Sequence, residues 1–334
     1  MTFPLSRRAA LSAAIAAACT PAFAQKATRA GAAAANWPTR PLRILVGFPG
    51  GSTPDLVART IAEPLSRALG QPVVVDNKPG AGGNIAADAV VKSTDDHTIG
   101  VMINGNMTIA KLLNPATPFD PVKDLAPVSL IGTAPLVLAA PANAPGTNAQ
   151  EFFAAARSAG AKWSYGSPGV GTVGHIGMEL LKSRTGIEPV HVPYPGNPQV
   201  INAMISGQIQ LALLPPGLVT QQVRAGKLRA IGVTSMGRSS LVPEYPSLDE
   251  GGVTRAFQLE IWTAAAAPRS MPKPIVDKLS GLIAEIARTP EVRQKLFQQG
   301  WQVAGTSSEG LANRVKADTA LLGGIIESRH IKAE

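Results

Sequence analysis

Short apolar segments alternate with longer amphipathic segments along most of this chain, and this alternation constrains its fold more than any other feature. Strands are predicted over residues 42–48, 72–76 and 98–103, with a helix over 54–69 between the first two. A strand, a helix and another strand in succession form the βαβ order. That order predicts a parallel sheet with helices on both faces.

The alternation returns in the middle of the chain. Strands are predicted over 136–140, 162–166, 189–192, 210–214 and 228–233, and helices over 150–159, 172–184, 199–206 and 218–225. Two such series in 334 residues exceed one hydrophobic core, so we expect two α/β domains. The C-terminal part, 273–331, is predicted to be mostly helical, because prolines mark its helix starts.

The first residues of the chain predict export. Two arginines, at positions 7 and 8, precede an alanine-rich apolar run and then Ala22-Phe23-Ala24, the small-x-small pattern of a cleavage site. We expect a signal peptide over 1–24, a flexible linker over 25–36 and a periplasmic mature protein. The paired arginines leave the Sec route and the twin-arginine route both open.

The cysteine content excludes several kinds of protein chemistry. The single cysteine, Cys19, lies inside the leader, where attachment of a lipid is an alternative to cleavage after Ala24. With cleavage after Ala24 the mature chain has no cysteine. It can then form no disulfide, no zinc site with thiolate ligands and no cysteine nucleophile.

Charge and aromatic content argue against a nucleic-acid partner. The formal net charge is +9, but Lys and Arg are dispersed and aromatic residues make up only 4% of the chain. Proteins that bind nucleic acid usually combine basic stripes with aromatic stacking platforms. The four histidines show no metal-ligand spacing, so we expect neither a metal nor a cofactor.

A first glycine turn follows the first predicted strand. It runs Phe48-Pro49-Gly50-Gly51-Ser52-Thr53, with Thr53 as the predicted N-cap and Pro54 as the first helical residue. The free N–H groups and the positive dipole end of a helix start favour a carboxylate or phosphate, and Ser52 and Thr53 can add hydroxyl donors. For Asp55 and Arg59 we expect an ion pair along the helix.

A second glycine turn follows the strand predicted over 162–166. Gly169, Gly171 and Gly174 have the G-x-G-x-x-G spacing of dinucleotide-binding enzymes. That fingerprint requires an acidic residue at the end of the next strand, whereas the nearest acid, Glu188, precedes that strand. We therefore interpret the two turns as two helix starts that face each other across a cleft and hold one small anion.

Several segments together resemble one family. The motifs WPTRPLRILVGFPGG, VVVDNKPGAGGNIAA, WSYGSPGVGTVGHI and VPYPGNPQVINAMISGQIQ occur in this order and resemble the Bug-type substrate-binding proteins of tripartite tricarboxylate transporters. The resemblance spans almost the whole mature chain. It implies a type II periplasmic-binding-protein fold, in which two α/β domains are joined by crossing strands and hold a ligand in a cleft. Residues 37–140 and 236–334 would form domain 1, and residues 141–235 would form domain 2.

The resemblance also implies a binding site. The first carboxylate-binding loop of the family falls on 48–53 and the second on 167–175, and our candidates for the far end of the ligand lie elsewhere. The ligand-binding residues expected in this way are Phe48, Pro49, Gly50, Gly51, Ser52, Thr53, Asn104, Ser167, Gly169, Gly171, Thr172, His175, Tyr194 and Leu214.

The expected function is that of a monomeric receptor, not an enzyme. It would close around a small carboxylate-containing acid and deliver it to the membrane subunits of a tripartite tricarboxylate transporter, or to a sensor. Gly50-Gly51 stands one place earlier than is usual in the family, and Gln210 occupies a position that is often acidic. A neutral or amide ligand therefore stays an alternative. A secreted hydrolase using Ser167 is another, although the G-x-S-x-G motif is absent.

Overall fold

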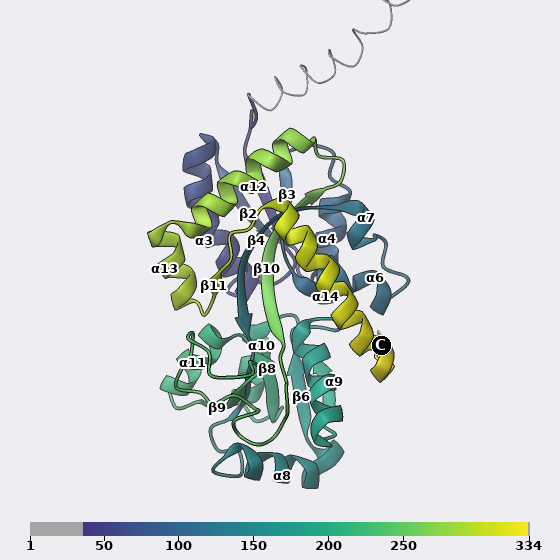
Figure 1. Cartoon of the computed structure of the whole chain (residues 1–334), viewed down its shortest axis with the longest axis vertical. Coiled ribbons are helices and arrows are strands. Elements are labelled where there is room, and N and C mark those ends of the chain that lie inside the picture. The colour runs from purple at the N-terminus through teal and green to yellow at the C-terminus, as the bar shows by residue number, and fades with distance from the viewer. Residues whose placement is uncertain (1–35, 333–334) are drawn as a thin grey trace, which may run out of the picture.

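The computed structural model describes residues 36–332. The predicted signal peptide, 1–24, and the predicted linker up to residue 35 lie outside these residues. The described chain forms two α/β lobes that lie end to end (Figure 1). None of its helices combines the length and the apolarity that crossing a membrane requires.

A six-stranded sheet forms the centre of the first lobe, in the order β11-β4-β10-β3-β1-β2. The strands are β1 (Leu42–Val46), β2 (Val73–Asn77), β3 (Thr98–Ile103), β4 (Leu125–Pro135), β10 (Glu260–Pro268) and β11 (Gln302–Val303). β1, β2 and β3 pair in parallel, whereas β10 and β11 pair antiparallel with their neighbours. The predicted parallel pairing therefore holds for β1, β2 and β3 but not for the rest of the sheet, since β4 leads out to the other lobe and β10 returns from it.

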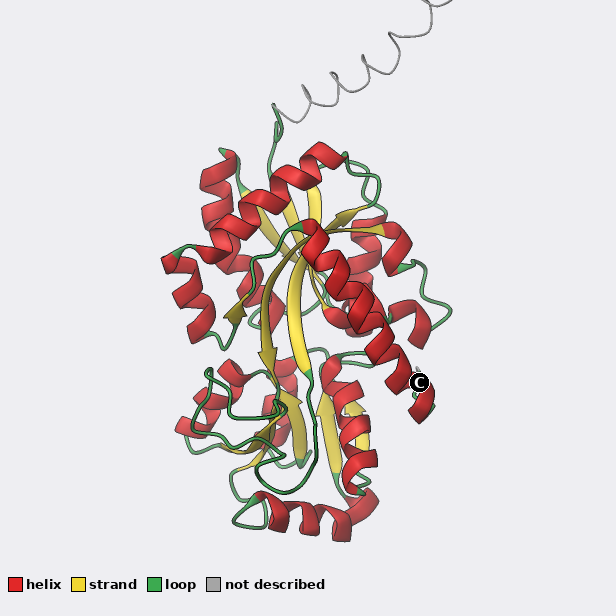
Figure 2. Ribbon diagram, viewed as in Figure 1, coloured by secondary structure: helices red, strands yellow, loops and turns green. Residues whose placement is uncertain are grey.

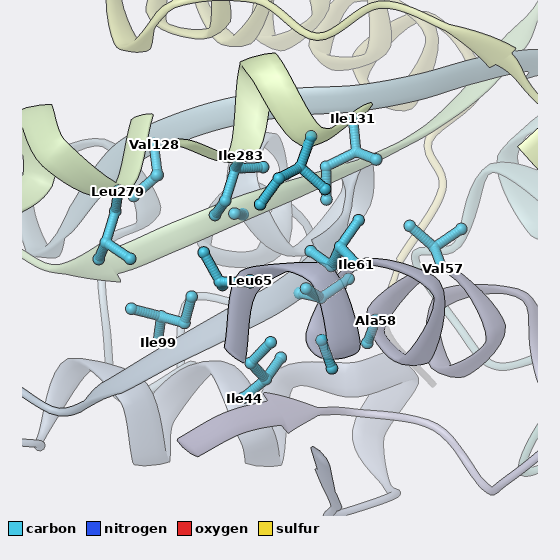
Figure 3. Close-up of a cluster of buried hydrophobic side chains, with 14 of the residues drawn as sticks. Ile44, Val57, Ala58, Ile61, Leu65, Ile99, Val128, Ile131, Leu279 and Ile283 are labelled. Carbon is cyan, nitrogen blue, oxygen red and sulfur yellow. The ribbon is translucent and has the colours of Figure 1, made fainter. Parts of the chain in front are cut away.

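Helices cover both faces of the first sheet (Figure 2). The helical segments of this lobe are α3 (Thr53–Leu69), η1 (Ala81–Gly83), α4 (Asn84–Val91), α5 (Asn104–Thr108), α6 (Ala110–Leu113), α7 (Pro121–Asp124), α12 (Lys273–Arg288), α13 (Pro290–Gln298) and α14 (Ser308–Arg329). The apolar stripe of α3 faces the sheet, so that Ile61 and Leu65 pack among Ile44, Ile99 and Ile283 (Figure 3). This packing fixes the end of α3 that carries the first glycine turn.

The second lobe is built on a five-stranded sheet, in the order β7-β6-β8-β5-β9. Its strands are β5 (Val137–Pro141), β6 (Ser164–Ser167), β7 (Val190–Pro193), β8 (Leu211–Leu214) and β9 (Leu228–Val233), and its helices are α8 (Ala149–Ala159), η2 (Gly160–Lys162), α9 (Val173–Thr185), α10 (Asn197–Ile205) and α11 (Pro216–Arg224). β6 pairs in parallel with β7 and β8, whereas β5 pairs antiparallel with β8 and β9. The predicted helices and strands of this lobe all form.

Two crossings join the lobes, and both differ from the predicted boundaries. β4 leads through Leu136 into β5, which belongs to the second sheet, so the chain leaves the first lobe before residue 140. The return lies at β10 rather than near 236, because Leu259 and Thr234 exchange hydrogen bonds and Phe257 packs in the second lobe's core. We therefore use 36–135 and 260–332 as the first lobe and 137–259 as the second.

The C-terminal helix α14 contacts both lobes. Leu311 and Val315, near its start, pack in the core of the first lobe. Leu322 and Ile326, two turns further on, pack with residues of the second lobe. In Figure 1 this helix runs from the upper lobe down to the side of α9.

Candidate ligand-binding site

A pocket with a cavity volume of about 40 Å³, partly open to solvent, lies between the two lobes. Its lining residues are Phe48, Ser52, Thr53, Pro54, Ile103, Asn104, Leu136, Pro168, Thr172, Val173, Gly174, Asn197, Leu213, Pro215, Ile261, Thr263 and Trp301. Each of these side chains is uncharged. The two predicted glycine turns, more than 100 residues apart in the chain, meet at this pocket.

Asp55 stabilises the first glycine turn through hydrogen bonds. Its carboxylate accepts hydrogen bonds from the Gly51 amide (2.9 Å), the Asn77 side chain (2.9 Å) and Arg59 (3.0 Å). The predicted ion pair between Asp55 and Arg59 is thereby confirmed. Burial alone would raise the pKa of Asp55, but these hydrogen bonds and the Arg59 charge outweigh it and lower that pKa below its usual value. Asp55 therefore stays ionised and fixes the backbone of the turn.

These contacts change which donors of the first turn face the pocket. The N-cap of α3 is Ser52 rather than the predicted Thr53, and the Ser52 hydroxyl donates to the Pro49 carbonyl. The Gly51 amide is bound to Asp55, and Gly50 and Gly51 are exposed. Thr53 is left as the main donor of this turn. Its amide opens the helix, and its hydroxyl oxygen accepts a hydrogen bond, which leaves the hydroxyl hydrogen free to donate.

The second glycine turn is closed by its own hydrogen bonds. The Thr172 hydroxyl donates to the Gly169 carbonyl (2.7 Å), and the Gly169 amide donates to Ser167 Oγ (3.2 Å). Gly171, at φ +80°, donates its amide to His175 Nδ1 (3.3 Å). A positive φ favours glycine at this position. As the N-cap, Thr172 leaves the first-turn amides of Val173 and Gly174, both lining the pocket, without a partner inside α9.

A stack of rings supports the second turn on the side away from the pocket. His191 stacks on Tyr165 (ring centroids 4.8 Å apart) and on His175 (4.3 Å apart). The Ser167 hydroxyl lies 2.7 Å from His191 Nε2. The Tyr165 hydroxyl donates to Glu179, which also accepts a hydrogen bond from Lys182. Ser167 is fully buried, so its hydroxyl shapes the turn rather than facing the cleft.

His175 is held neutral in this arrangement. Burial lowers its pKa from 6.5 to about 4, the Glu179 carboxylate opposes this shift, and the Lys182 charge adds to it. The hydrogen bond from Gly171 requires an unprotonated Nδ1, which agrees with a neutral ring. His175 therefore acts on the pocket through the backbone of Gly171.

Close approaches between the lobes flank the pocket. Asn197 Nδ2 of the second lobe donates to Thr53 Oγ1 of the first (3.1 Å). A Cβ added at Gly105 would lie 2.4 Å from the Gly171 carbonyl oxygen. A Cβ added at Gly82 would lie 2.6 Å from the Val170 carbonyl oxygen, so the PGAGGN segment is an interlobe contact as well as a turn. The two lobes are closed against each other.

The structure separates the three candidates for the far end of the ligand. Asn104 lines the pocket. Leu214 packs in the second lobe's core, because alternation along β8 turns Leu213 toward the cleft and Leu214 to the opposite face. Tyr194 is half-buried and packs near Gly166 and Val200.

Other lining residues were not among the sequence candidates. Ile261 and Thr263 lie on β10, Leu136 lies at the other crossing, and Trp301 precedes β11. These positions reach the pocket only through strand pairing between distant segments. Asn197 and Val173 follow Gly196 and Thr172 at helix starts, and for these two the local helix signals provide a clue.

Comparison with known proteins assigns the chain to a family. Residues 57–331 match the family described as "Tripartite tricarboxylate transporter family receptor". The chain belongs to this receptor family. It is 34% identical, over 284 residues, to the UPF0065 protein in the tcbD-tcbE intergenic region of Pseudomonas sp. strain P51; the match covers 85% of this chain and 84% of that protein.

Solved structures agree with this assignment. The receptor is similar to the periplasmic binding protein BugD, with a TM-score of 0.84 and 29% identity, over 89% of this chain and 100% of that one. It is similar to Rpa4515 of Rhodopseudomonas palustris, solved with adipate, with a TM-score of 0.85 and 30% identity, over 89% of this chain and 99% of that one. The predicted periplasmic-binding-protein fold and Bug-type family are thereby confirmed.

Proposed function

We propose that this receptor binds a small carboxylate-containing organic acid between its lobes, and that one carboxylate of the acid is held by Thr53, Val173 and Gly174. We call these three residues the carboxylate seat. One observation carries the proposal: helices α3 and α9, from different lobes, both begin at the same uncharged pocket. The positive dipole ends and the first-turn amides of both helices favour an anion there.

The physical basis is hydrogen bonding without a formal positive charge. Backbone amides and the Thr53 hydroxyl replace the water that a carboxylate loses on entering the cleft. Because the amides of Gly51, Gly169 and Gly171 are engaged within the turns, the seat is preorganised. A rigid seat loses little conformational freedom when the ligand binds.

Domain closure completes the site. Each lobe supplies one side of the seat, and Asn197 links the second lobe to the Thr53 hydroxyl of the first. A ligand that contacts both lobes binds the closed arrangement more tightly than the open one, and it stabilises the closed arrangement by this difference in affinity. The closed surface is the form that a transporter or a sensor would recognise.

We further propose that the receptor acts in the periplasm as a monomer, and that it delivers its ligand to the membrane subunits of a tripartite tricarboxylate transporter or to a sensor. Support comes from the family assignment and from the leader pattern in residues 1–24. We assign it no catalytic role, since Ser167 and His191 lie behind the second glycine turn.

A thermal-shift screen tests this function. The mature protein is heated with mono-, di- and tricarboxylates, aromatic acids, amides and NAD, and hits are followed by calorimetry. A ligand that binds only the folded state raises the melting temperature, and the rise grows with ligand concentration. At 100 times its Kd the ligand adds about 2.7 kcal/mol to the free energy of unfolding. We expect stabilisation by one class of carboxylate and none by NAD. The proposal would be overturned if NAD alone stabilised the protein, or if none of the acids did.

A further inference from the structure

Four polar atoms of pocket-lining residues have no hydrogen-bond partner among the described residues, and one of them, Asn197 Oδ1, belongs to the second lobe. The other three belong to the first lobe. They are Asn104 Oδ1, Thr263 Oγ1 and Trp301 Nε1, and the three residues are at most 1% exposed. All three residues line the pocket. Leaving a buried polar group unpaired costs roughly 1–3 kcal/mol, so such groups in a binding cavity indicate where a ligand supplies the partner. We call Asn104, Thr263 and Trp301 the pocket floor.

Strand register brings these three residues together. Thr263 of β10 lies opposite Ile103 of β3 on one side and opposite Gly132 of β4 on the other. Residues directly opposite in antiparallel strands point to the same face of the sheet. A Cβ added at Gly132 would lie 3.4 Å from Trp301 Cβ, so Trp301 packs on the face to which Thr263 points. Asn104 follows Ile103 at the end of β3.

The chemistry of the pocket floor is mixed. Asn104 Nδ2 donates to the Glu260 carbonyl (3.2 Å), and the reversed amide would place two oxygens together, so Oδ1 is the free atom and can only accept. Trp301 Nε1 can only donate, and the Thr263 hydroxyl can do either. The floor therefore needs one ligand group that both donates and accepts hydrogen bonds.

A second carboxylate does not meet this need. An ionised carboxylate only accepts hydrogen bonds, so it would pair with Trp301 and Thr263 but leave its negative charge beside the unpaired Asn104 oxygen. Every lining residue is uncharged, so none supplies a compensating cation. A buried charge without a partner costs far more than a buried neutral group.

We propose that the pocket floor binds a neutral group with both an N–H or O–H donor and an acceptor, such as a primary amide or an alcohol. The ligand then carries one carboxylate at the carboxylate seat and this neutral group at its other end. This inference rests on the proposed function, since it takes the carboxylate seat as given. It separates this receptor from Rpa4515, which was solved with a dicarboxylate, adipate.

Calorimetry with matched acids tests the proposal at pH 7.5. The probes are succinamate, glutaramate and adipamate, each compared with the dicarboxylate of the same length, namely succinate, glutarate and adipate. We expect the best-fitting monoamide to bind on the order of 10-fold or more tightly than its dicarboxylate, because the dicarboxylate leaves one buried polar group of the floor unpaired. Equal or tighter binding of the dicarboxylate in every pair would overturn the inference and leave the proposed function standing. Failure of all six acids, together with the whole carboxylate screen, would overturn the proposed function itself.

Two variants assign the preference to the pocket floor. Thr263→Val removes the hydroxyl with little change of shape, whereas Trp301→Phe removes the indole N–H together with part of a large buried ring. Each should reduce the preference for the monoamide several-fold. This preference is the ratio of the monoamide affinity to the dicarboxylate affinity within one variant, so a general loss of binding does not change it. Trp163→Phe, in the second lobe beside Phe152, is the matched control and should keep the wild-type preference. An unchanged preference in the floor variants would contradict the assignment. If both variants fail to fold, the six-acid comparison on the wild-type protein decides the proposal.

Discussion

At the scale of single residues, Thr172 closes the second glycine turn. Its hydroxyl donates to the Gly169 carbonyl, so we expect Thr172→Val to misplace the amides of Val173 and Gly174. The Gly169 carbonyl would keep its hydrogen bonds from the Thr172 amide (3.3 Å) and the Ser167 hydroxyl (3.1 Å) but lose its shortest one. The loss of one hydrogen bond costs roughly 0.5–1.5 kcal/mol, which predicts up to about 10-fold weaker binding of the acid found in the screen. Thr172→Ser keeps the hydroxyl and should bind nearly as well as wild type. Calorimetry on both variants checks this, and equal affinities for the valine and serine variants would refute it.

His175 makes a second prediction at the residue scale. Its pKa is about 4 in the folded protein, below the unfolded value of 6.5, so between these values the unfolded chain binds more protons. The stability contributed by neutral His175 is therefore fully present above pH 6.5 and is lost as the pH falls toward 4. Denaturant unfolding of wild type and His175→Asn from pH 7.5 to 4.5 measures this difference.

The matched control for that experiment is His330, which is exposed at the C-terminal end of α14. We expect His330→Gln to keep the wild-type dependence of stability on pH, whereas His175→Asn should flatten it. An identical pH dependence in all three proteins would show that His175 is not held neutral by burial.

At the scale of secondary-structure elements, the glycine contacts between the lobes permit closure. The φ of Gly105 suits alanine, but in the closed form an added Cβ would lie 2.4 Å from the Gly171 carbonyl oxygen. Gly105→Ala should therefore fold normally but close poorly, with ligand affinity reduced at least about 10-fold by even modest interlobe strain. Gly281→Ala, where an added Cβ meets no atom within 4 Å on α12, should bind as wild type. Equal affinities in the two variants would contradict this account of closure.

Sequence predicted these elements unevenly, for a physical reason. The starts of α3 and α9 carry local signals, a hydroxyl residue and proline or glycine, and both form within one residue of their predicted positions. β4 and β10 lack such a signal, since β4 includes Pro127 and β10 contains four consecutive alanines. Their place is set by pairing between distant segments. The same holds for Thr263 and Trp301, which reach the pocket only through that pairing.

At the scale of the whole molecule, closure should be a measurable change of shape. The lobes are joined by the β4–β5 and β10 crossings, and α14 contacts both of them. We expect ligand to reduce the radius of gyration measured by small-angle X-ray scattering, because it stabilises the closed form. Gly105→Ala should stay at the larger value at the same ligand concentration. A radius that is unchanged by saturating ligand would argue against domain closure.

In the proposed complex, helix starts from both lobes hold one carboxylate of the ligand. The most direct test is an NMR titration of the isotope-labelled mature protein that follows the amide protons of Thr53, Val173 and Gly174. We predict that these signals move downfield together and saturate at the affinity given by calorimetry, because all three amides donate to the same carboxylate. A titration that saturates while these three amides stay unchanged, with the shifts confined to other residues, would contradict the account.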